Sequence, residues 1–209
     1  MYDRGYGKCE FQIMDMIFDF ETLSTDRVNG VVLSLALLVY DPNRFNENDQ
    51  YTYTELLENS QFIKLKVDDQ VKNYGRKIDQ DTLKWWGDQS KEARQSQFIP
   101  NENDQPLDQL LPFVQKHTES HSLKKVFSRG NTFDNIFLDY IAIDTGQNVP
   151  WPHWVVRDTR SMIEGMAYGS ELSNSFIPEG LDQFFIPHDP QHDIVMDVMR
   201  MQALAIAIG

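Results

Sequence analysis

Two apolar runs near the start of the chain constrain its fold more than any other feature. Residues 11–20 and 31–40 are rich in Ile, Val, Leu, Met and Phe, and each is long enough for a strand that crosses a whole domain. Asn29-Gly30, directly before the second run, is a strong signal for a two-residue hairpin turn. The sequence therefore predicts an antiparallel hairpin of buried strands.

Downstream of this hairpin the period of the apolar pattern changes. Residues 61–67 alternate as a half-buried strand does, whereas residues 107–117 and 133–143 repeat apolar side chains at the helical spacing. The remaining elements are expected as short helices at 79–86, 90–98 and 158–166, short strands at 124–128 and 153–156, and a final helix at 193–208. Three leading strands followed by alternating helices and strands predict an α/β fold with a mixed sheet and helices on its faces.

Composition narrows the functional classes. The chain has 209 residues, 41% of them hydrophobic, and no linker divides 1–209 into two cores, so one packed domain is expected. Nineteen Lys and Arg stand against 32 Asp and Glu, which excludes a broad basic face for nucleic acid but leaves room for bound cations that supply charge locally. Cys9 is the sole cysteine, and the longest apolar run, 31–40, is too short to span a membrane. With no leader pattern visible, we expect a cytoplasmic protein without a membrane partner.

Two acidic residues stand at the end of the first apolar run. Asp19 and Glu21 are two positions apart, so in a strand they project from one face while Phe18 and Phe20 project from the other. Adjacent carboxylates repel each other unless a cation lies between them. The ordinary alternative is a solvated strand end, where acidic residues are common.

Later positions extend this candidate cluster. Asp134 opens the helix predicted at 133–143, where an acid also complements the helix dipole. His192 lies at the entrance of the final helix, and Asp197 follows about one turn later, within reach of the same spot.

The histidine motif occurs twice in this stretch. His188-Asp189 repeats His192-Asp193, but we favour the later pair for its spacing to Asp197, and expect His188 in a loop flanked by prolines. Asp193 is interpreted as an ordinary acid of the helix start.

The order Asp-x-Glu, Asp, His-x4-Asp resembles the signature of the DEDDh group of 3′–5′ exonucleases, which are DnaQ-like enzymes of the ribonuclease H-like superfamily. Five stretches of the chain resemble, more narrowly, the phage exonuclease A (DexA) type. They are FDFETL at 18–23, WWGDQSKEAR at 85–94, RGNTFD at 129–134, RDTRSMIE at 157–164 and LDQFFIPHDPQHDIVMDVMRMQ at 181–202. The resemblance implies a ribonuclease H-like fold, a mixed central sheet whose first three strands are antiparallel, flanked by helices. It also implies two divalent cations, Mg²⁺ or Mn²⁺, and the host cytoplasm as location if the chain is phage-encoded.

The family pattern also assigns roles to the candidate residues. Asp19 would bridge both cations, Glu21 and Asp197 would complete the shell of the first, and Asp134 would hold the second. His192 would take the proton from the attacking water. Hard oxygen ligands suit Mg²⁺ or Mn²⁺, and a pair of cations about 3.5–4 Å apart stabilises both the attacking and the leaving oxygen.

Candidate substrate contacts are less specific than the acidic cluster, and they comprise Phe20, Thr22, Leu23, Arg129 and Trp86. Strand alternation favours a core position for Phe20. Trp85 and Trp86 are adjacent and cannot share a helix face, so one is expected in the core and the other free to stack on a terminal base. For Arg129, an ion pair within the protein is the ordinary alternative to a phosphate contact.

The predicted activity is metal-dependent hydrolysis from the 3′ end of single-stranded nucleic acid, with DNA favoured over RNA. The alternatives are a 3′–5′ exoribonuclease with the same site, a catalytically silent nucleic-acid-binding module of the same fold, and a metal-dependent hydrolase of small phosphate esters. The expected partner is the 3′ end of single-stranded DNA or RNA, and homo-oligomerisation stays open.

Overall fold

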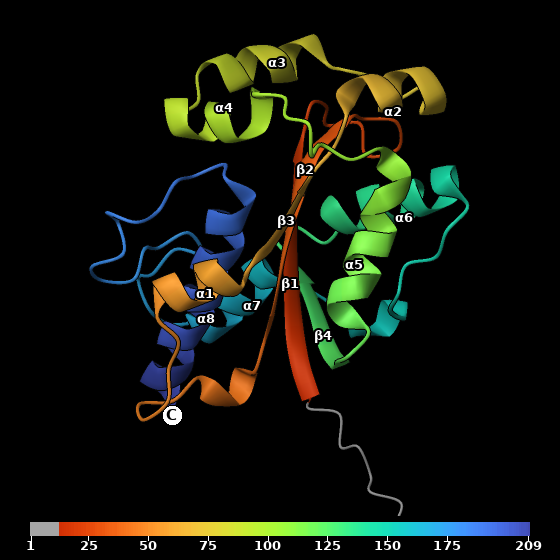
Figure 1. The fold of residues 1–209 in the computed structure, drawn as a ribbon. Helices are drawn as coiled ribbons and strands as arrows, with labels where there is room; N and C mark the ends of the chain where they lie inside the picture. Colours follow the sequence, from red (N-terminus) through yellow and green to blue (C-terminus); the bar gives the residue numbers. More distant parts are fainter. Residues whose placement is uncertain (1–12) are drawn as a thin grey trace, which may run out of the picture.

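A five-stranded sheet forms the centre of the computed structural model, which describes residues 13–209 (Figure 1). The strands are β1 (Ile13–Thr22), β2 (Val32–Tyr40), β3 (Gln61–Lys64), β4 (Ser122–Ser128) and β5 (Val156–Asp158), in the order β3-β2-β1-β4-β5. The pairs β1–β2 and β2–β3 are antiparallel, whereas β4 is parallel to both β1 and β5. The predicted mixed sheet with three antiparallel leading strands is therefore confirmed, while residues 11 and 12 of the first predicted strand, and Cys9, lie outside the described residues.

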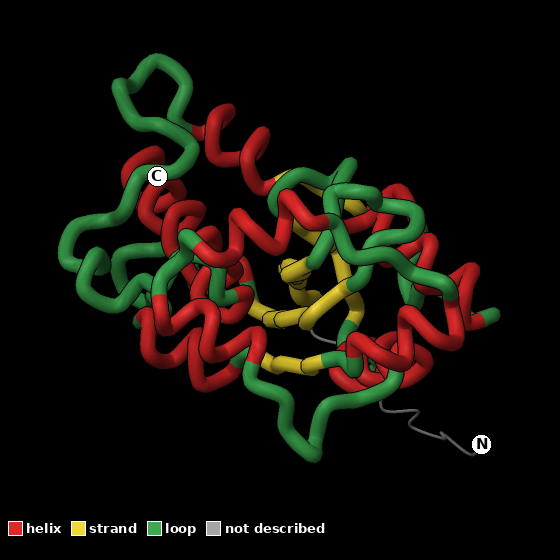
Figure 2. Tube along the Cα trace, turned by 90° about the horizontal axis from the view of Figure 1, so that it is seen from above, coloured by secondary structure: helices red, strands yellow, loops and turns green. Residues whose placement is uncertain are grey.

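Helices cover both faces of the sheet and one of its ends. They are α1 (Tyr53–Asn59), α2 (Val67–Tyr74), α3 (Gln80–Gly87), α4 (Lys91–Phe98), α5 (Leu110–Thr118), α6 (Asp134–Thr145), α7 (Thr159–Met166) and α8 (Pro190–Ile208). In Figure 1, α1, α7 and α8 lie on one side of the sheet and α5 and α6 on the other, while α2, α3 and α4 cap its upper end. Figure 2 shows the same layering from above.

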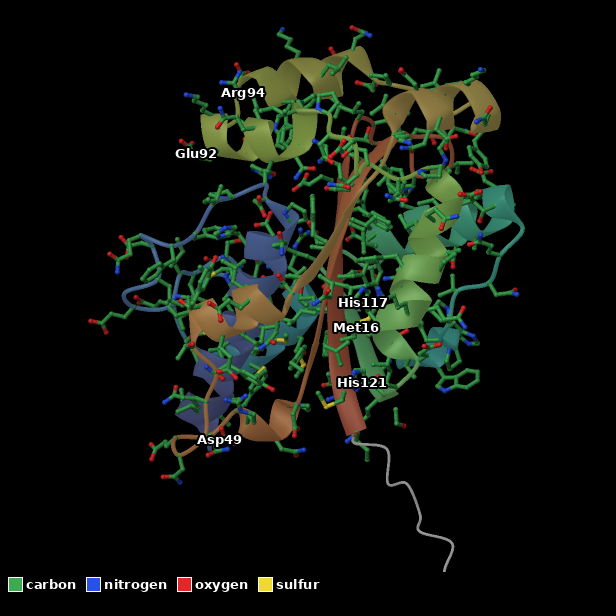
Figure 3. The ribbon with its side chains drawn as sticks, in the orientation of Figure 1. Met16, Asp49, Glu92, Arg94, His117 and His121 are labelled. Atoms are coloured by element: carbon green, nitrogen blue, oxygen red, sulfur yellow. The ribbon has the colours of Figure 1, made fainter. Side chains whose placement is uncertain are left out.

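Alternation along β1 divides the core into two layers. Met16, Phe18 and Phe20 pack into the layer that contains α5 and α6, and Met16 is marked in Figure 3. Ile17 packs with α8 on the opposite face. Because every second residue shares a face, Asp19 and Glu21 also turn toward the α8 side. Burial of each large side chain contributes about 1.5–3 kcal/mol, which fixes this orientation of the strand.

The connection between β1 and β2 is longer than the two-residue turn predicted at Asn29-Gly30, so that prediction is wrong. The N–H of Leu23 donates to the Val31 carbonyl at 2.8 Å and closes a wide loop. A Cβ atom on Gly30 would lie 2.5 Å from the Asp26 carbonyl oxygen. The glycine is thus needed for a close backbone approach, not for the positive φ angles of a tight turn.

The predicted helices at 79–86, 90–98 and 158–166 are confirmed with small shifts, and each has a side-chain N-cap at Asp79, Ser90 or Asp158. The short helices α1 and α2 were not predicted. The predicted strand at 153–156 is largely wrong, because residues His153–Val155 form a 3-10 turn and β5 begins at Val156. Among the described residues, no helix has the length and apolar character that crossing a bilayer requires.

Candidate active site

The first acidic pair lies at the end of β1. Asp19 is partly buried and Glu21 is 8% exposed, and both side chains face the α8 side of the sheet. The neighbouring Phe18 and Phe20 are packed into the opposite layer. The predicted alternation of β1 is therefore what brings two carboxylates together.

Asp134 reaches the same region from the first turn of α6. The N–H of Phe20 donates to Asp134 Oδ1 at 3.4 Å, which joins α6 to β1. The other oxygen, Oδ2, is buried and has no hydrogen-bond partner among the residues that the structure describes. A buried carboxylate oxygen without a donor is costly unless something else binds it, and a cation is the simplest candidate.

His188 and Asp193 complete a tight cluster with Glu21. One potential ligand atom from each of the three residues lies within 4.8 Å of the others. The backbone N–H of His188 donates to Asp193 Oδ2 at 3.0 Å. His188 has a φ of 64°, the left-handed region that non-glycine residues rarely adopt. The structure thus places in one cluster His188, expected in a loop outside the site, and Asp193, expected as an ordinary acid of the helix start.

Mutual repulsion marks these carboxyl groups as one electrostatic unit. Burial, followed by the charges of Asp134, Glu21, Asp193 and Asp197, raises the pKa of Asp19 well above its usual value. Burial and then the charge of Asp193 raise the pKa of Glu21 in the same way. Burial is also the largest cause for Asp134, whose pKa rises to about 8, and for Asp193, whose pKa rises to about 7. Divalent cations would relieve this repulsion, and a set of carboxylate oxygens fits hard cations such as Mg²⁺ or Mn²⁺.

His192 has a different environment from the predicted one. Its Nδ1 lies 2.8 Å from the hydroxyl of Tyr53 on α1, and the two rings are 5.9 Å apart. The prediction that His192 and not His188 joins the acidic cluster is corrected by this geometry. The physical reason is the start of α8, which begins at Pro190 with Asp189 as its N-cap, three residues before the predicted start. The pair Asp189-Pro190 is a helix-start signal that the sequence already contained.

Asp197 lies beside Asp19, but its oxygen atoms are occupied by the protein itself. Its Oδ1 accepts from Arg129 Nη1 at 2.6 Å and from Arg200 Nη1 at 2.7 Å, and its Oδ2 accepts from Thr159 at 2.5 Å. A carboxylate that balances two guanidinium groups has little capacity left for a cation. The structure therefore pairs the predicted Asp197 with arginines, whereas Asp193 is the aspartate of α8 that lies in one cluster with Glu21 and His188.

The predicted substrate contacts separate into buried and accessible ones. Trp86 is 1% exposed, and its Nε1 donates to the Thr22 carbonyl at 2.9 Å, so the ring belongs to the core with Leu23. Arg129 is bound to Asp197 and to the loop at Asn174. These positions of Trp86, Leu23 and Arg129 correct the expectation that they face substrate.

A pocket of about 490 Å³ lies next to the acidic cluster, where Glu21 forms part of its wall. It is lined by Phe20, Glu21, Thr22, Thr25, Asp79, Asp81, Thr82, Trp85 and Phe133. Trp85 is 42% exposed, so it is the accessible member of the tryptophan pair. Glu92 and Arg94 belong to the stretch 85–94 that also contains Trp85, and they project outward from α4 (Figure 3).

Comparison with known proteins identifies the family. The model of the 3′-5′ exoribonuclease Rv2179c-like domain matches residues 14–194, which is most of the chain. The chain belongs to this family. An exodeoxyribonuclease of Enterobacteria phage T4 is 29% identical over 214 residues, covering 94% of this chain and 92% of the relative. This member of the Rv2179c-like family is thus a DnaQ-like 3′–5′ exonuclease, a hydrolase.

Solved structures show the fold of the Rv2179c-like family member. A zinc-bound complex of E. coli exonuclease I with single-stranded DNA has a TM-score of 0.58 at 14% identity, covering 92% of this chain and 40% of that one. A complex of the same enzyme with a dA16 oligonucleotide has a TM-score of 0.57 at 16% identity, covering 93% of this chain and 42% of that one. The chain therefore spans about two fifths of these neighbours and shares their ribonuclease H-like fold.

Proposed function

We propose that this exonuclease removes nucleotides from the 3′ end of single-stranded DNA, and that Asp19, Glu21, Asp134 and Asp193 hold two divalent cations, Mg²⁺ or Mn²⁺, for that reaction. The observation that carries the proposal is the convergence of these carboxyl groups from β1, α6 and α8. Burial is the largest cause that raises the pKa of each of them, and repulsion by nearby carboxylates adds to it. Such an arrangement destabilises the protein unless cations occupy it.

When bound, the cations would act as Lewis acids and stabilise negative charge on the attacking and leaving oxygens of the phosphodiester. The protein supplies the remaining chemistry. His188 is placed against Glu21 and Asp193, and burial lowers the pKa of its imidazole. A neutral imidazole at neutral pH can accept the proton of the attacking water, so we assign the role of general base to His188.

The pocket beside Glu21 fits the terminal nucleoside. Trp85 and Phe133 provide aromatic surface for a base, and Thr82 provides a hydroxyl group for a polar contact, while the buried Phe20 and Thr22 form the floor of the pocket. Arg160 is exposed, and its charge lowers the pKa of Asp134. Since it makes no ion pair with any residue that the structure describes, Arg160 is available for a substrate phosphate.

DNA and RNA remain the two candidate substrates. The T4 relative is an exodeoxyribonuclease and is aligned over almost the whole chain, which supports DNA. The family model carries the description of an exoribonuclease, which keeps RNA as the second candidate. Both substrates fit a site that binds cations and the 3′ end of a strand.

A matched digestion tests the proposal. Single-stranded DNA and RNA oligomers of one sequence, labelled at the 5′ end, should give ladders that shorten from the 3′ end, faster for DNA. A chelator should abolish cleavage, and Mg²⁺ or Mn²⁺ should restore it. Asp19→Asn should be inactive, whereas Asp182→Asn, an exposed carboxyl outside the cluster, serves as the charge-matched control. Cleavage that persists in the chelator or in Asp19→Asn would overturn the metal assignment.

A further inference from the structure

His188 stands in an unusual backbone conformation that needs support. Among the described residues, it is the one non-glycine residue with a positive φ. Such a conformation is strained in a residue with a side chain and persists only where the surroundings hold it. The N–H bond to Asp193 holds the backbone, but it leaves the rotation of the imidazole ring free.

Helix α3 supplies the contact that restricts the ring. The centroid of Trp85 lies 4.8 Å from that of His188, at an interplanar angle of 79°. Trp86 approaches the same imidazole at 6.5 Å and 76°. Edge-to-face pairs of this kind have a preferred geometry, so they orient a ring as well as contact it.

The tryptophan pair is itself fixed to the active-site strand. Trp86 is anchored through its Nε1 to the carbonyl of Thr22, the last residue of β1, and packs against Phe98 of α4. The adjacent Trp85 is thereby carried on a helix that is tied to the strand holding Asp19 and Glu21. In Figure 1, α3 and α4 cross the end of the sheet above the start of α8.

We propose that Trp85 is a positioning residue, which holds the His188 imidazole in the orientation needed to take a proton from water. This inference rests on the proposed role of His188 as general base. It differs from a base-stacking role, because its effect runs through the histidine and not through the terminal nucleobase. The partly exposed face of Trp85 lines the pocket, while its contact with His188 links that pocket to the proton acceptor.

A double-mutant cycle tests the proposal with kcat as the main readout. Trp85→Ala should lower kcat by about 10–100-fold, because small misplacements of a catalytic group have effects of that size. In a His188→Ala background the same substitution should change kcat by less than about twofold, since no base is left to position. Trp85→Phe should restore most of kcat, because a phenyl ring can keep the edge contact.

A substrate with an abasic 3′-terminal nucleotide separates the two roles. If Trp85 acts through His188, Trp85→Ala lowers kcat on this substrate as much as on the intact oligomer. If it only stacks on the base, the variant raises KM on the intact oligomer and has no effect on the abasic one, which would overturn the inference. Trp154→Ala, an exposed tryptophan (67%) outside the site, is the matched control.

Failure of this inference is distinguishable from failure of the proposed function. Full activity of His188→Ala would refute the general base itself. A slow His188→Ala together with an unimpaired Trp85→Ala would refute only the positioning role. Thermal melting of each variant checks the fold, and a Trp85→Ala protein whose kcat loss is equally large in both backgrounds contradicts the proposal.

Discussion

The backbone N–H of His188 binds the carboxylate of Asp193 at 3.0 Å, across the turn that leads into α8. This bond spans the N-cap Asp189, whose side chain accepts from the N–H groups of Gln191 and His192. Both His188 and Asp193 are therefore held by the start of one helix, next to Glu21. His192 lies one residue from Asp193 in the chain but is bonded to Tyr53.

Replacing each of the two histidines, His188 and His192, with alanine should separate their roles. We expect His188→Ala to lower kcat by about 10²–10⁴-fold, the usual contribution of a general base. His192→Ala should keep most of its activity and lose about 0.5–1.5 kcal/mol of stability with the Tyr53 hydrogen bond. Steady-state kinetics and urea denaturation measure both effects, and Tyr53→Phe is the matched control for the lost bond. Equal inactivation by the two histidine substitutions would contradict the assignment.

The two aspartates of α8 should have different roles, Asp197 in stability and Asp193 in nuclease activity. Asp197→Asn leaves Arg129 and Arg200 without their shared carboxylate, so the free energy of unfolding should fall by about 3–5 kcal/mol. Asp193→Asn removes a repelling charge, so the metal-free protein should be at least as stable as the parent while it loses nuclease activity. Chemical denaturation in a chelator, paired with the oligomer assay, distinguishes them. A stable Asp197→Asn would show that the arginine pair does not depend on this carboxylate.

The acidic cluster predicts how stability depends on pH. The pKa of Asp134 is about 8 and that of Asp193 about 7 in the folded protein, against about 3.9 in an unfolded chain. The folded protein therefore binds these protons more tightly, and the metal-free protein should lose stability as the pH rises from about 4 to about 8. Mg²⁺ or Mn²⁺ should stabilise it most at the upper end of this range, where the carboxylates are ionised.

Thermal melting across this pH range, with a chelator and with added cation, measures the effect. Asp134→Asn should flatten the decline in the chelator. Asp182→Asn changes the net charge equally and should leave the slope of the parent. A melting temperature that stays level with pH in the chelator would show that the cluster is not repulsive.

Arg160 should contribute to substrate binding more than to turnover. Arg160→Ala is expected to raise KM for an oligomer and to reduce the slope of log KM against log salt concentration by about 0.7, the value for one phosphate contact on a single strand. Arg157→Ala is the control, because its guanidinium donates to the carbonyls of Trp154 and Val156. An unchanged KM and salt slope in Arg160→Ala would remove this residue from the phosphate path.

Alternation and capping signals predicted the elements that carry most of the site. Asp19 and Glu21 share a face because β1 is a long buried strand, and a period of two is unambiguous over such a run. Asp158 directly precedes α7 and caps it, accepting from the N–H of Ser161. These features depend on residues that are neighbours in the sequence, so they can be predicted without a structure.

The errors arise where distant parts of the chain decide the outcome. Two overlapping copies of His-x4-Asp are equally consistent with the motif, and only the packing of α8 against the sheet places Asp197 beside Arg129, which directly follows β4. Asn29-Gly30 has the pattern of a tight turn, but part of the space around Gly30 is closed by a distant side chain, since a Cβ atom there would lie 3.1 Å from Phe137 Cε1. Long-range contacts of this kind leave no local pattern.

The repeat of His-Asp at an interval of four residues, about one helical turn, has a consequence for comparing relatives. An alignment that slides α8 by one turn still matches a histidine and an aspartate at the motif columns, so it carries no visible error. It would nevertheless replace His188, which faces the acidic cluster, by His192, which is bonded to Tyr53. It would also replace Asp193, which lies beside Glu21, by Asp197, which is paired with two arginines. On the proposed assignment, a His192→Ala variant chosen from such an alignment would stay active and would wrongly suggest that the enzyme needs no histidine.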